Sequence, residues 1–361
     1  MINIIAPINQ LGYGITGLNL SKALHQVSDV SLWPISTPQV TNQLDSDLVS
    51  RMLNNSLRPD FSAPCIRIWH QHDMSQFVGH GLKIGFPIFE LDKFTDIEKH
   101  HLGHLDKIFV CSHWAKDVVL KETSTKFAYE ENVHVIPLGV DSTIFQVQSR
   151  DAAKTVFFNC GKWEVRKGHD VLVDAFNKAF NDDDDVELWM LCDNPFYSPD
   201  EQKEWEQLYS TSKLGSKIRI INRLDTQKEV YNIMANTDCG VFPSRAEGWN
   251  LELLEMMSCG KHVIATDYSA HTEFCTKENS LLVTIEEKET AYDGKWFTGK
   301  SGEWAKLGDN QVEQVVVHMR EVHKRKQSAS LGVNEGGVAT AQEFSWNNSA
   351  SKVLESIHEY I

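Results

Sequence analysis

Short apolar runs alternate along the chain with longer segments whose apolar residues recur every three to four positions. Ile2–Ala6 is the first short run, and it stops before Pro7, as a strand buried on both faces would. Residues 168–180 form one of the longer segments and have the spacing of an amphipathic helix. The other predicted strands lie at residues 30–33, 65–69, 83–89, 107–111, 133–136, 155–160, 187–192, 217–221, 239–243 and 262–266.

This alternation of strand and helix predicts an α/β fold, in which parallel sheets are covered by helices on both faces. The pattern restarts after Arg150, and 361 residues are enough for two domains of roughly 150 residues each. We therefore expect a Rossmann-like domain at residues 1–150 and a second one at residues 151–346. Residues 291–307, which contain Trp296, Phe297 and Trp304, are predicted to be an insertion after a strand.

The charge balance limits the partners of the chain. It has 35 basic and 50 acidic residues, a formal charge of −15, which argues against nucleic-acid binding because phosphates need a basic surface. The same balance argues against a protein held on anionic lipid. No apolar run approaches the roughly 20 residues that cross a bilayer, and residues 1–5 lack the basic start of a signal peptide. The seven cysteines include no C-x-x-C pair, which favours free thiols in a reducing cytoplasm.

Residues 244–255 are the most informative stretch, because they follow a predicted strand and open a predicted helix. Ligands bind at such positions in open α/β sheets, and the N–H groups of the helix N-terminus suit a phosphate. Glu247 and Glu255 would be about 12 Å apart on one helix, whereas the carboxylates of a retaining glycosidase are roughly 5 Å apart. They could instead hold two ends of an elongated ligand such as a nucleotide-sugar. The alternative is that Glu255 is an exposed helix residue and that Glu247 is an acid near the helix N-terminus favoured by the helix dipole.

Three cations, Lys162, Arg166 and Lys167, lie between the predicted strand at 155–160 and the helix at 168–180. Buried phosphates need such charges, and this acidic chain has few clusters of them. A solvated basic turn is the alternative.

The sequence GYGITG at residues 12–17 matches the dinucleotide fingerprint G-x-G-x-x-G. The first glycine comes six residues after the predicted strand ends, and the acid expected at the end of the second strand is missing, because Asp29 precedes that strand. The pattern therefore disfavours a nicotinamide dehydrogenase. It fits a flexible loop whose backbone faces a ligand phosphate.

His70, His72 and Asp73 follow the predicted strand at 65–69. Two histidines two residues apart could suggest a metal, but no third cluster of histidine or cysteine supports a closed site. A histidine that hydrogen-bonds a substrate hydroxyl is favoured over a metal ligand, and a structural histidine is the alternative. We predict neither a metal nor a cofactor.

Together these residues resemble the retaining glycosyltransferases of family 4, which have the GT-B fold. Glu247 and Glu255 match the E-x7-E motif of that family within PSRAEGWNLELLEMMSCGKHVIAT, and GKWEVRKGHDVLVDAF is similar to its strand, basic loop and helix. VIPLGVDSTIF, IFVCSHWAKDVV and EFSWNNSASKVLESI resemble further family segments. The resemblance implies two Rossmann-like domains that face each other across a cleft, with a last helix, residues 347–361, that crosses back to the N-terminal domain.

The resemblance also implies roles for individual residues. Glu247 would contact the transferred sugar, and Glu255 would hold the ribose hydroxyls. Lys162 and Lys167 would bind the diphosphate, although many family members have arginine at the first position. Arg166 is a possible substitute for that arginine, because Lys162 lacks the bidentate fork. The remaining expected contacts are the backbone N–H groups of Gly248, Trp249, Asn250 and Leu251 with the sugar and diphosphate, Gly12, Tyr13 and Gly14 with the diphosphate, His72 with the donor sugar, and Arg223 and Leu224 with the nucleobase.

The activity that the resemblance implies is the metal-independent transfer of a sugar from a UDP- or GDP-sugar to an acceptor hydroxyl, with retention of configuration. The acceptor, a glycan, a lipid-linked sugar or a small molecule, would bind the N-terminal domain. A sugar-nucleotide epimerase or phosphorylase of similar fold is one alternative. A non-catalytic subunit that binds nucleotide-sugars is another, but it would be expected to have lost Glu247 or Lys167.

Overall fold

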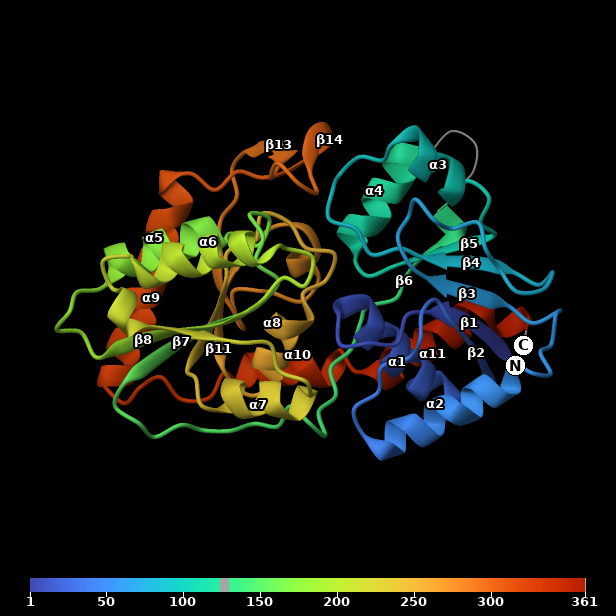
Figure 1. Cartoon of the computed structure of the whole chain (residues 1–361), viewed down its shortest axis with the longest axis horizontal. Coiled ribbons are helices and arrows are strands. Elements are labelled where there is room, and N and C mark those ends of the chain that lie inside the picture. The colour runs from blue at the N-terminus through green and yellow to red at the C-terminus, as the bar shows by residue number, and fades with distance from the viewer. Residues whose placement is uncertain (124–129, 361) are drawn as a thin grey trace. The chain divides into compact units, whose positions relative to one another are not determined.

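The computed structural model describes residues 1–123 and 130–360, and the chain divides into two compact units. Unit 1 comprises Met1–Gly139 and Phe344–Ile361, and unit 2 comprises Val140–Glu343. Figure 1 shows that each unit has its own sheet with helices packed against it. Each unit is therefore an α/β structure of the kind that the alternating pattern predicts.

Unit 1 is built on a parallel sheet of six strands in the order β2-β1-β3-β4-β5-β6. These strands are β1 (Ile2–Ala6), β2 (Val30–Pro34), β3 (Cys65–Ile68), β4 (Lys83–Phe86), β5 (Lys107–Val110) and β6 (Val133–Val135). Its described helices are α1 (Gly12–His25), α2 (Gln43–Asn55), α3 (Asp96–Leu102), α4 (His113–Thr123) and α11 (Trp346–Ile357). Helix α11 packs against α1, and the Ser349 hydroxyl donates a hydrogen bond to the Pro137 carbonyl at 2.6 Å. The C-terminal residues therefore complete unit 1.

The prediction of a flexible glycine loop at residues 12–17 is wrong. These residues form the first turns of α1, and the connection from β1 is confined to residues 7–11. A Cβ atom at Gly14 would collide with Asn9, and one at Gly17 would collide with the Pro7 carbonyl. The two glycines therefore permit close packing of the helix on the chain that leaves β1.

Unit 2 contains a second parallel sheet of six strands, in the order β12-β11-β10-β7-β8-β9. These strands are β7 (Thr155–Gly161), β8 (Val186–Cys192), β9 (Ile218–Ile221), β10 (Cys239–Phe242), β11 (His262–Thr266) and β12 (Leu281–Val283). The described helices are α5 (His169–Ala179), α6 (Pro199–Ser210), α7 (Gln227–Ala235), α8 (Leu251–Ser258), α9 (Asp309–Gln327) and α10 (Glu335–Glu343). The predicted insertion is an antiparallel hairpin of β13 (Lys288–Tyr292) and β14 (Thr298–Ala305).

The sheet of unit 2 brings two loops to one edge. Strands β7 and β10 are parallel neighbours, with Phe157 opposite Cys239, so both have their carboxyl ends at the same edge. Residues 162–168 leave β7 there, and residues 243–250 leave β10. Gly168, between the first loop and α5, has φ 70°, and a Cβ atom on it would collide with the Pro243 carbonyl of the second loop. Only glycine allows this close approach at that backbone angle.

Two further predictions can be compared with the structure. All seven cysteines are free thiols, and all except the half-buried Cys160 are buried. Among residues 1–123 and 130–360, no helix has the length and apolar character needed to span a bilayer.

Candidate functional site

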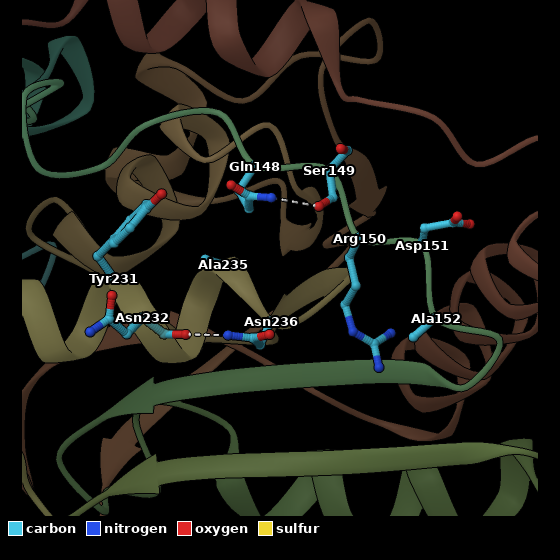
Figure 2. A pocket seen from close by; sticks show the side chains of 9 residues that line it. All are labelled: Gln148, Ser149, Arg150, Asp151, Ala152, Tyr231, Asn232, Ala235 and Asn236. Atoms are coloured by element: carbon cyan, nitrogen blue, oxygen red, sulfur yellow. Dashed lines mark hydrogen bonds between the residues drawn. The ribbon is translucent and has the colours of Figure 1, made fainter.

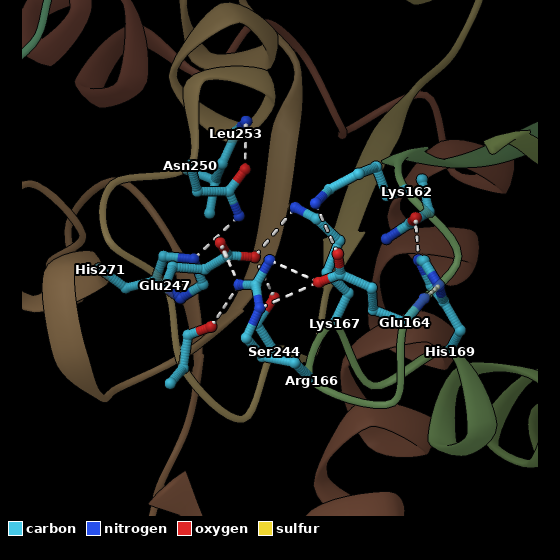
Figure 3. A network of polar contacts seen from close by, with 12 residues as sticks. Lys162, Glu164, Arg166, Lys167, His169, Ser244, Glu247, Asn250, Leu253 and His271 are labelled. Atoms are coloured by element: carbon cyan, nitrogen blue, oxygen red, sulfur yellow. Dashed lines mark hydrogen bonds and ion pairs between the residues drawn. The ribbon is translucent and has the colours of Figure 1, made fainter. Parts of the chain in front are cut away.

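The basic loop, residues 162–168, and the acidic loop, residues 243–250, are joined by hydrogen bonds at the carboxyl edge of the sheet (Figure 3). The Arg245 backbone N–H donates to the Arg166 carbonyl at 2.7 Å, and Nη1 of Arg166 donates to the Ala246 carbonyl at 2.7 Å. The two loops therefore form one polar structure, although they are about 80 residues apart in the chain.

Glu247 lies at the centre of this structure and is buried. Its Oε2 accepts a hydrogen bond from Arg166 Nη1 at 2.7 Å, and its Oε1 accepts from Lys167 Nζ at 3.1 Å and from the Ser244 hydroxyl at 2.9 Å. Its backbone N–H donates to the Ser269 hydroxyl at 2.8 Å. Both the main chain and the carboxylate of Glu247 are therefore held in one orientation.

The ionisation of Glu247 follows from these contacts. Burial alone would raise the pKa of this carboxyl, but Arg166 and Lys167 outweigh burial and hold the pKa well below its usual range. Burial would likewise lower the pKa of Lys167, yet Glu247 and Glu252 raise it above its usual range. At neutral pH Glu247 is therefore an ionised carboxylate, which accepts hydrogen bonds and donates none.

Glu164 compensates part of the remaining positive charge of the basic loop. One of its oxygens pairs with Lys162 Nζ at 2.8 Å, and the other accepts from Arg166 Nε at 3.0 Å and Nη2 at 2.7 Å. Three cations and two carboxylates leave these five side chains with a net charge of +1. Lys162 is the accessible cation of the group, since 37% of its side chain is exposed.

The buried His169 connects the basic loop to the strands through hydrogen bonds. Nδ1 of His169 accepts the Glu164 backbone N–H at 3.2 Å, so the proton of the neutral ring is on Nε2, which donates to Asn159 Oδ1 at 2.9 Å. Asn159 in turn donates to the Val241 carbonyl at 2.7 Å. Burial, together with Lys167, lowers the pKa of His169 to about 3. This neutral ring therefore links the basic loop to both central strands.

The N-terminus of α8 presents backbone donors beside Glu247. Asn250, with φ 87°, caps the helix by accepting the Leu253 N–H, and its Nδ2 donates to Nε2 of buried His271 at 2.9 Å. In the described chain, the backbone N–H groups of Gly248 and Leu251 have no hydrogen-bond acceptor. Such free donors at a helix N-terminus favour an anionic or hydroxylated ligand.

Glu255 lies one turn into α8 and is only 6% exposed. No residue in the described chain forms a hydrogen bond or an ion pair with its carboxyl group. Burial, with a smaller contribution from Glu252, raises the pKa of Glu255 well above its usual range. The oxygens of this carboxyl group are therefore available for hydrogen bonds from a ligand.

The hairpin β13–β14 is attached to the acidic loop through Arg245. This buried side chain pairs with both oxygens of Asp170 at 2.8 Å and with Glu289 of β13 at 3.1 Å. The Ala305 N–H donates to the Arg245 carbonyl at 2.9 Å. At the hairpin tip, Trp296 is 47% exposed and lies edge-to-face with exposed Phe196, whose ring is 5.6 Å from Lys162 Nζ.

The remaining predicted residues of unit 2 are Trp249, Arg223 and Leu224. Trp249 is buried against Phe274, with ring centroids 4.8 Å apart. Arg223 and Leu224 follow β9, two strands from β7 in the sheet, where Arg223 is exposed and Leu224 is half-buried.

The predicted site residues of unit 1 lie around the start of α1 and the end of β3. The Tyr13 hydroxyl donates to the Ile88 carbonyl at 2.6 Å and accepts the Ile88 N–H at 3.1 Å, so it is engaged with the backbone. Burial, together with Glu90, raises the pKa of Tyr13 well above its usual range. Gly12 has open space where a side chain would lie. His72 is exposed and stacks on His70, with ring centroids 5.3 Å apart.

Two other features of the described chain bear on ligand binding. Within residues 1–123 and 130–360, no group of three or more histidine, cysteine, aspartate or glutamate side chains is arranged to hold a metal ion. A cavity of about 690 Å³ lies on unit 2, between α7 and residues 148–152 (Figure 2), and it contains none of the predicted site residues. The residues that line this cavity are Gln148, Ser149, Arg150, Asp151, Ala152, Tyr231, Asn232, Ala235 and Asn236.

The fold is that of a known class. The chain is similar over 99% of its length to sucrose-phosphate synthase from Thermosynechococcus elongatus, with TM-score 0.71, 14% identity and 98% of that chain covered. It is similar to Anabaena Alr3699/HepE, crystallised with UDP and glucose, with TM-score 0.69, 15% identity and 99% of each chain covered. A glycosyltransferase from Rickettsia africae gives TM-score 0.67 and 14% identity over 99% of this chain and 98% of that one. The chain therefore has the GT-B fold, with two Rossmann-like domains.

The family model that matches the sequence lies within unit 2. Residues 154–293 match the family model Glycosyl transferases group 1. A curated relative, "Putative glycosyltransferase 45" of Sulfolobus islandicus filamentous virus, is 21% identical over 226 residues. The match covers 61% of this chain and 57% of that protein, so it spans little more than half of the relative. Both the basic loop and the acidic loop lie within the residues that this family model matches.

Proposed function

We propose that this protein is a retaining glycosyltransferase, which moves a sugar from a nucleotide-sugar to an acceptor hydroxyl without a metal ion. The observation that carries the proposal is the ionised Glu247, held between Arg166 and Lys167 where β10 meets α8. It lies in the loop before α8, next to backbone N–H groups that have no acceptor among the described residues, and Glu255, which has no partner among those residues, lies on α8 itself. The Glu247 carboxylate can accept hydrogen bonds from a sugar, the backbone N–H groups can donate to a diphosphate, and the Glu255 carboxylate can accept from a ribose.

Each part of the donor has a suitable partner. Glu255 accepts the two ribose hydroxyls, which would supply the hydrogen bonds that its buried carboxyl lacks. The N–H groups at 248–251, together with Lys162 and Lys167, bind the sugar and diphosphate. Arg223 and Leu224 contact the base. The structural neighbour crystallised with UDP and glucose makes UDP-sugars the first donors to test, followed by GDP-sugars.

The chemistry follows from the charges. The bond between the anomeric carbon and the diphosphate breaks, and Lys162 and Lys167 stabilise the negative charge that builds on the leaving group. The acceptor hydroxyl forms the new bond on the face from which the diphosphate departs, and its proton passes to a phosphate oxygen. Glu247, being ionised, has no proton to give to the leaving group, and it instead orients the transferred sugar by accepting hydrogen bonds from its hydroxyls. His72 contacts the donor sugar, and the N-terminal domain binds the acceptor.

A donor screen tests this function. The protein is heated with UDP-, GDP- and ADP-sugars in the presence of EDTA, and both the unfolding temperature and the release of nucleotide are recorded. A bound donor at 100 times its Kd would stabilise the protein by about 2.7 kcal/mol. Analysis of the anomeric configuration in the product separates retention from inversion. Absence of binding by every nucleotide-sugar would refute the proposal.

Lys167→Ala tests the charge on the leaving group. Lys167 is buried and pairs only with Glu247 among the carboxylates of the described residues. We expect turnover to fall at least about 100-fold while the protein stays folded. Lys178→Ala, which removes an exposed lysine on α5, is the matched control. Near-normal turnover by Lys167→Ala would exclude the assigned role.

A further inference from the structure

The Arg166 side chain is fully occupied by the protein itself. Its Nε and Nη2 donate to Glu164, and its Nη1 donates both to Glu247 and to the Ala246 carbonyl. Only 5% of the side chain is exposed. Each of the three nitrogens of the guanidinium therefore has a carboxylate or carbonyl partner within 3.0 Å.

This arrangement differs from the expectation that Arg166 binds the diphosphate. To reach a phosphate, the guanidinium would have to leave two buried carboxylates, which would then be uncompensated. Lys162 needs no such exchange, because more than a third of its side chain is exposed and a single carboxylate holds it. Lys162 is therefore the most exposed of the three cations and the one best placed to contact a phosphate.

We propose that Arg166 is a positioning residue, which orients Glu247 toward the transferred sugar and does not bind the diphosphate. This inference rests on the proposed function, because it assigns the purpose of Glu247 to the donor sugar. The chain of contacts runs from Glu247 through Arg166 to Glu164, whose backbone is fixed by His169. Glu247 lies in a loop without regular structure, so this link to the central strands defines the direction of its carboxylate.

The geometry requires arginine at this position. A planar guanidinium can contact two carboxylates and a carbonyl at fixed angles, whereas an ammonium group is a single point charge on a flexible stem. Lysine at position 166 would keep the local net charge of +1 and could pair with only one of the two carboxylates at full strength. Arg166→Lys therefore separates orientation from charge.

The main experiment compares wild type with Arg166→Lys, using UDP and whichever nucleotide-sugar the donor screen identifies. We expect the Kd of UDP to stay within about threefold, because charge is conserved and Arg166 does not touch the diphosphate. We expect kcat to fall about 30-fold or more with little change in KM, because the misdirected Glu247 loses its transition-state contacts. Arg150→Lys is the matched control, since Arg150 forms a partly buried pair with Asp238 at 2.6 Å, outside the proposed donor site. The inference is overturned if UDP binding weakens about tenfold or more, or if kcat stays near the wild-type value.

A second measurement needs no substrate. The Glu247 carboxyl is followed by ¹³C NMR during a pH titration, with its signal assigned from Glu247→Gln, and the titration is repeated in Arg166→Met. We expect the pKa of Glu247 to rise in that variant, because one of its two cations is removed. If Arg166→Met does not fold, the double variant with Glu164→Gln, which keeps the local charge, replaces it. An unchanged titration would show that the contact does not exist in solution and would overturn the inference.

The two measurements distinguish failure of this inference from failure of the proposed function. A wild-type protein that binds no nucleotide refutes the function, whatever the titration shows. A wild-type protein that transfers sugar, with an Arg166→Lys variant that does so equally well, refutes only the role of Arg166. A role limited to stability would lower the unfolding temperature without the separation of kcat from KM.

Discussion

Glu247→Gln should uncouple stability from nucleotide binding. In the wild type, one carboxylate oxygen accepts from Arg166 and the other from Lys167 and Ser244. In glutamine one of these oxygens becomes an NH2 group, which cannot accept, so one buried cation faces a donor. The net charge of the five side chains rises from +1 to +2. Breaking a buried pair in this way costs about 3–5 kcal/mol, a large part of the roughly 5–15 kcal/mol that stabilises a typical domain.

The same substitution should not weaken UDP binding. The extra positive charge attracts the diphosphate, so we expect UDP to stabilise the variant at least as much as the wild type, while turnover is lost. The assay is urea unfolding followed by tryptophan fluorescence, with and without UDP, beside the exposed-carboxylate control Glu287→Gln, which should leave the midpoint unchanged. A loss smaller than about 1 kcal/mol would show that Glu247 is not a buried ion-pair partner.

The pH dependence of this difference has a defined sign. The pKa of Glu247 is lower in the folded than in the unfolded protein, so its contribution to stability is fully present above the unfolded value of about 4.3. It is lost as the pH falls below that value towards the folded pKa. The stability difference between wild type and Glu247→Gln should therefore be full at pH 7 and shrink below pH ~4.3.

Two more predictions concern Glu255 and Gly168. The raised pKa of Glu255 means that ribose hydroxyls, which bind an ionised carboxylate more strongly than a neutral carboxyl, should drive proton release when a UDP-sugar binds. The affinity for the UDP-sugar should then increase with pH, and calorimetry in buffers of different ionisation enthalpy should detect the released proton. Glu255→Gln should weaken binding and abolish the proton release. A pH-independent affinity would contradict the ribose role. Gly168→Ala should destabilise the protein by about 1–2 kcal/mol from the positive φ alone. The clash of the new Cβ atom with the Pro243 carbonyl adds to that cost. Gly12→Ala, with open space around it, is the control, and equal thermal unfolding of the two variants would refute the close loop contact.

The fold was largely predictable, because buried parallel strands produce continuous apolar runs that are easily recognised in the sequence. Every predicted strand corresponds to a strand in the structure, with shifts of a few residues at the ends. The glycine segment was different. Spacing alone cannot distinguish glycines that face a ligand from glycines that let a helix pack closely, and Gly14 and Gly17 are of the second kind.

The sequence predicted where the candidate site lies in the chain, but it did not predict which side chains contact one another there. The loops at 162–168 and 243–250 were located because both follow strands and carry clustered charge. The pairing of Arg166 with Glu164 and Glu247 depends on which strands are neighbours, which the local sequence does not contain. His169 and His271 were missed because a single buried histidine leaves no pattern. Arg245 was visible in the motif, but its attachment to Glu289 required the hairpin.

The contacts between the two loops also limit how this site can change during evolution. The backbone N–H of Arg245 is hydrogen-bonded to the carbonyl of Arg166, and the Pro243 carbonyl leaves no room for a side chain at Gly168. A substitution that moves one loop must therefore be accompanied by one in the other, although the two are far apart in the chain. We expect residues 164 and 166 to covary with residues 245 and 247 among related sequences, so that donor preference changes by exchanging both loops together.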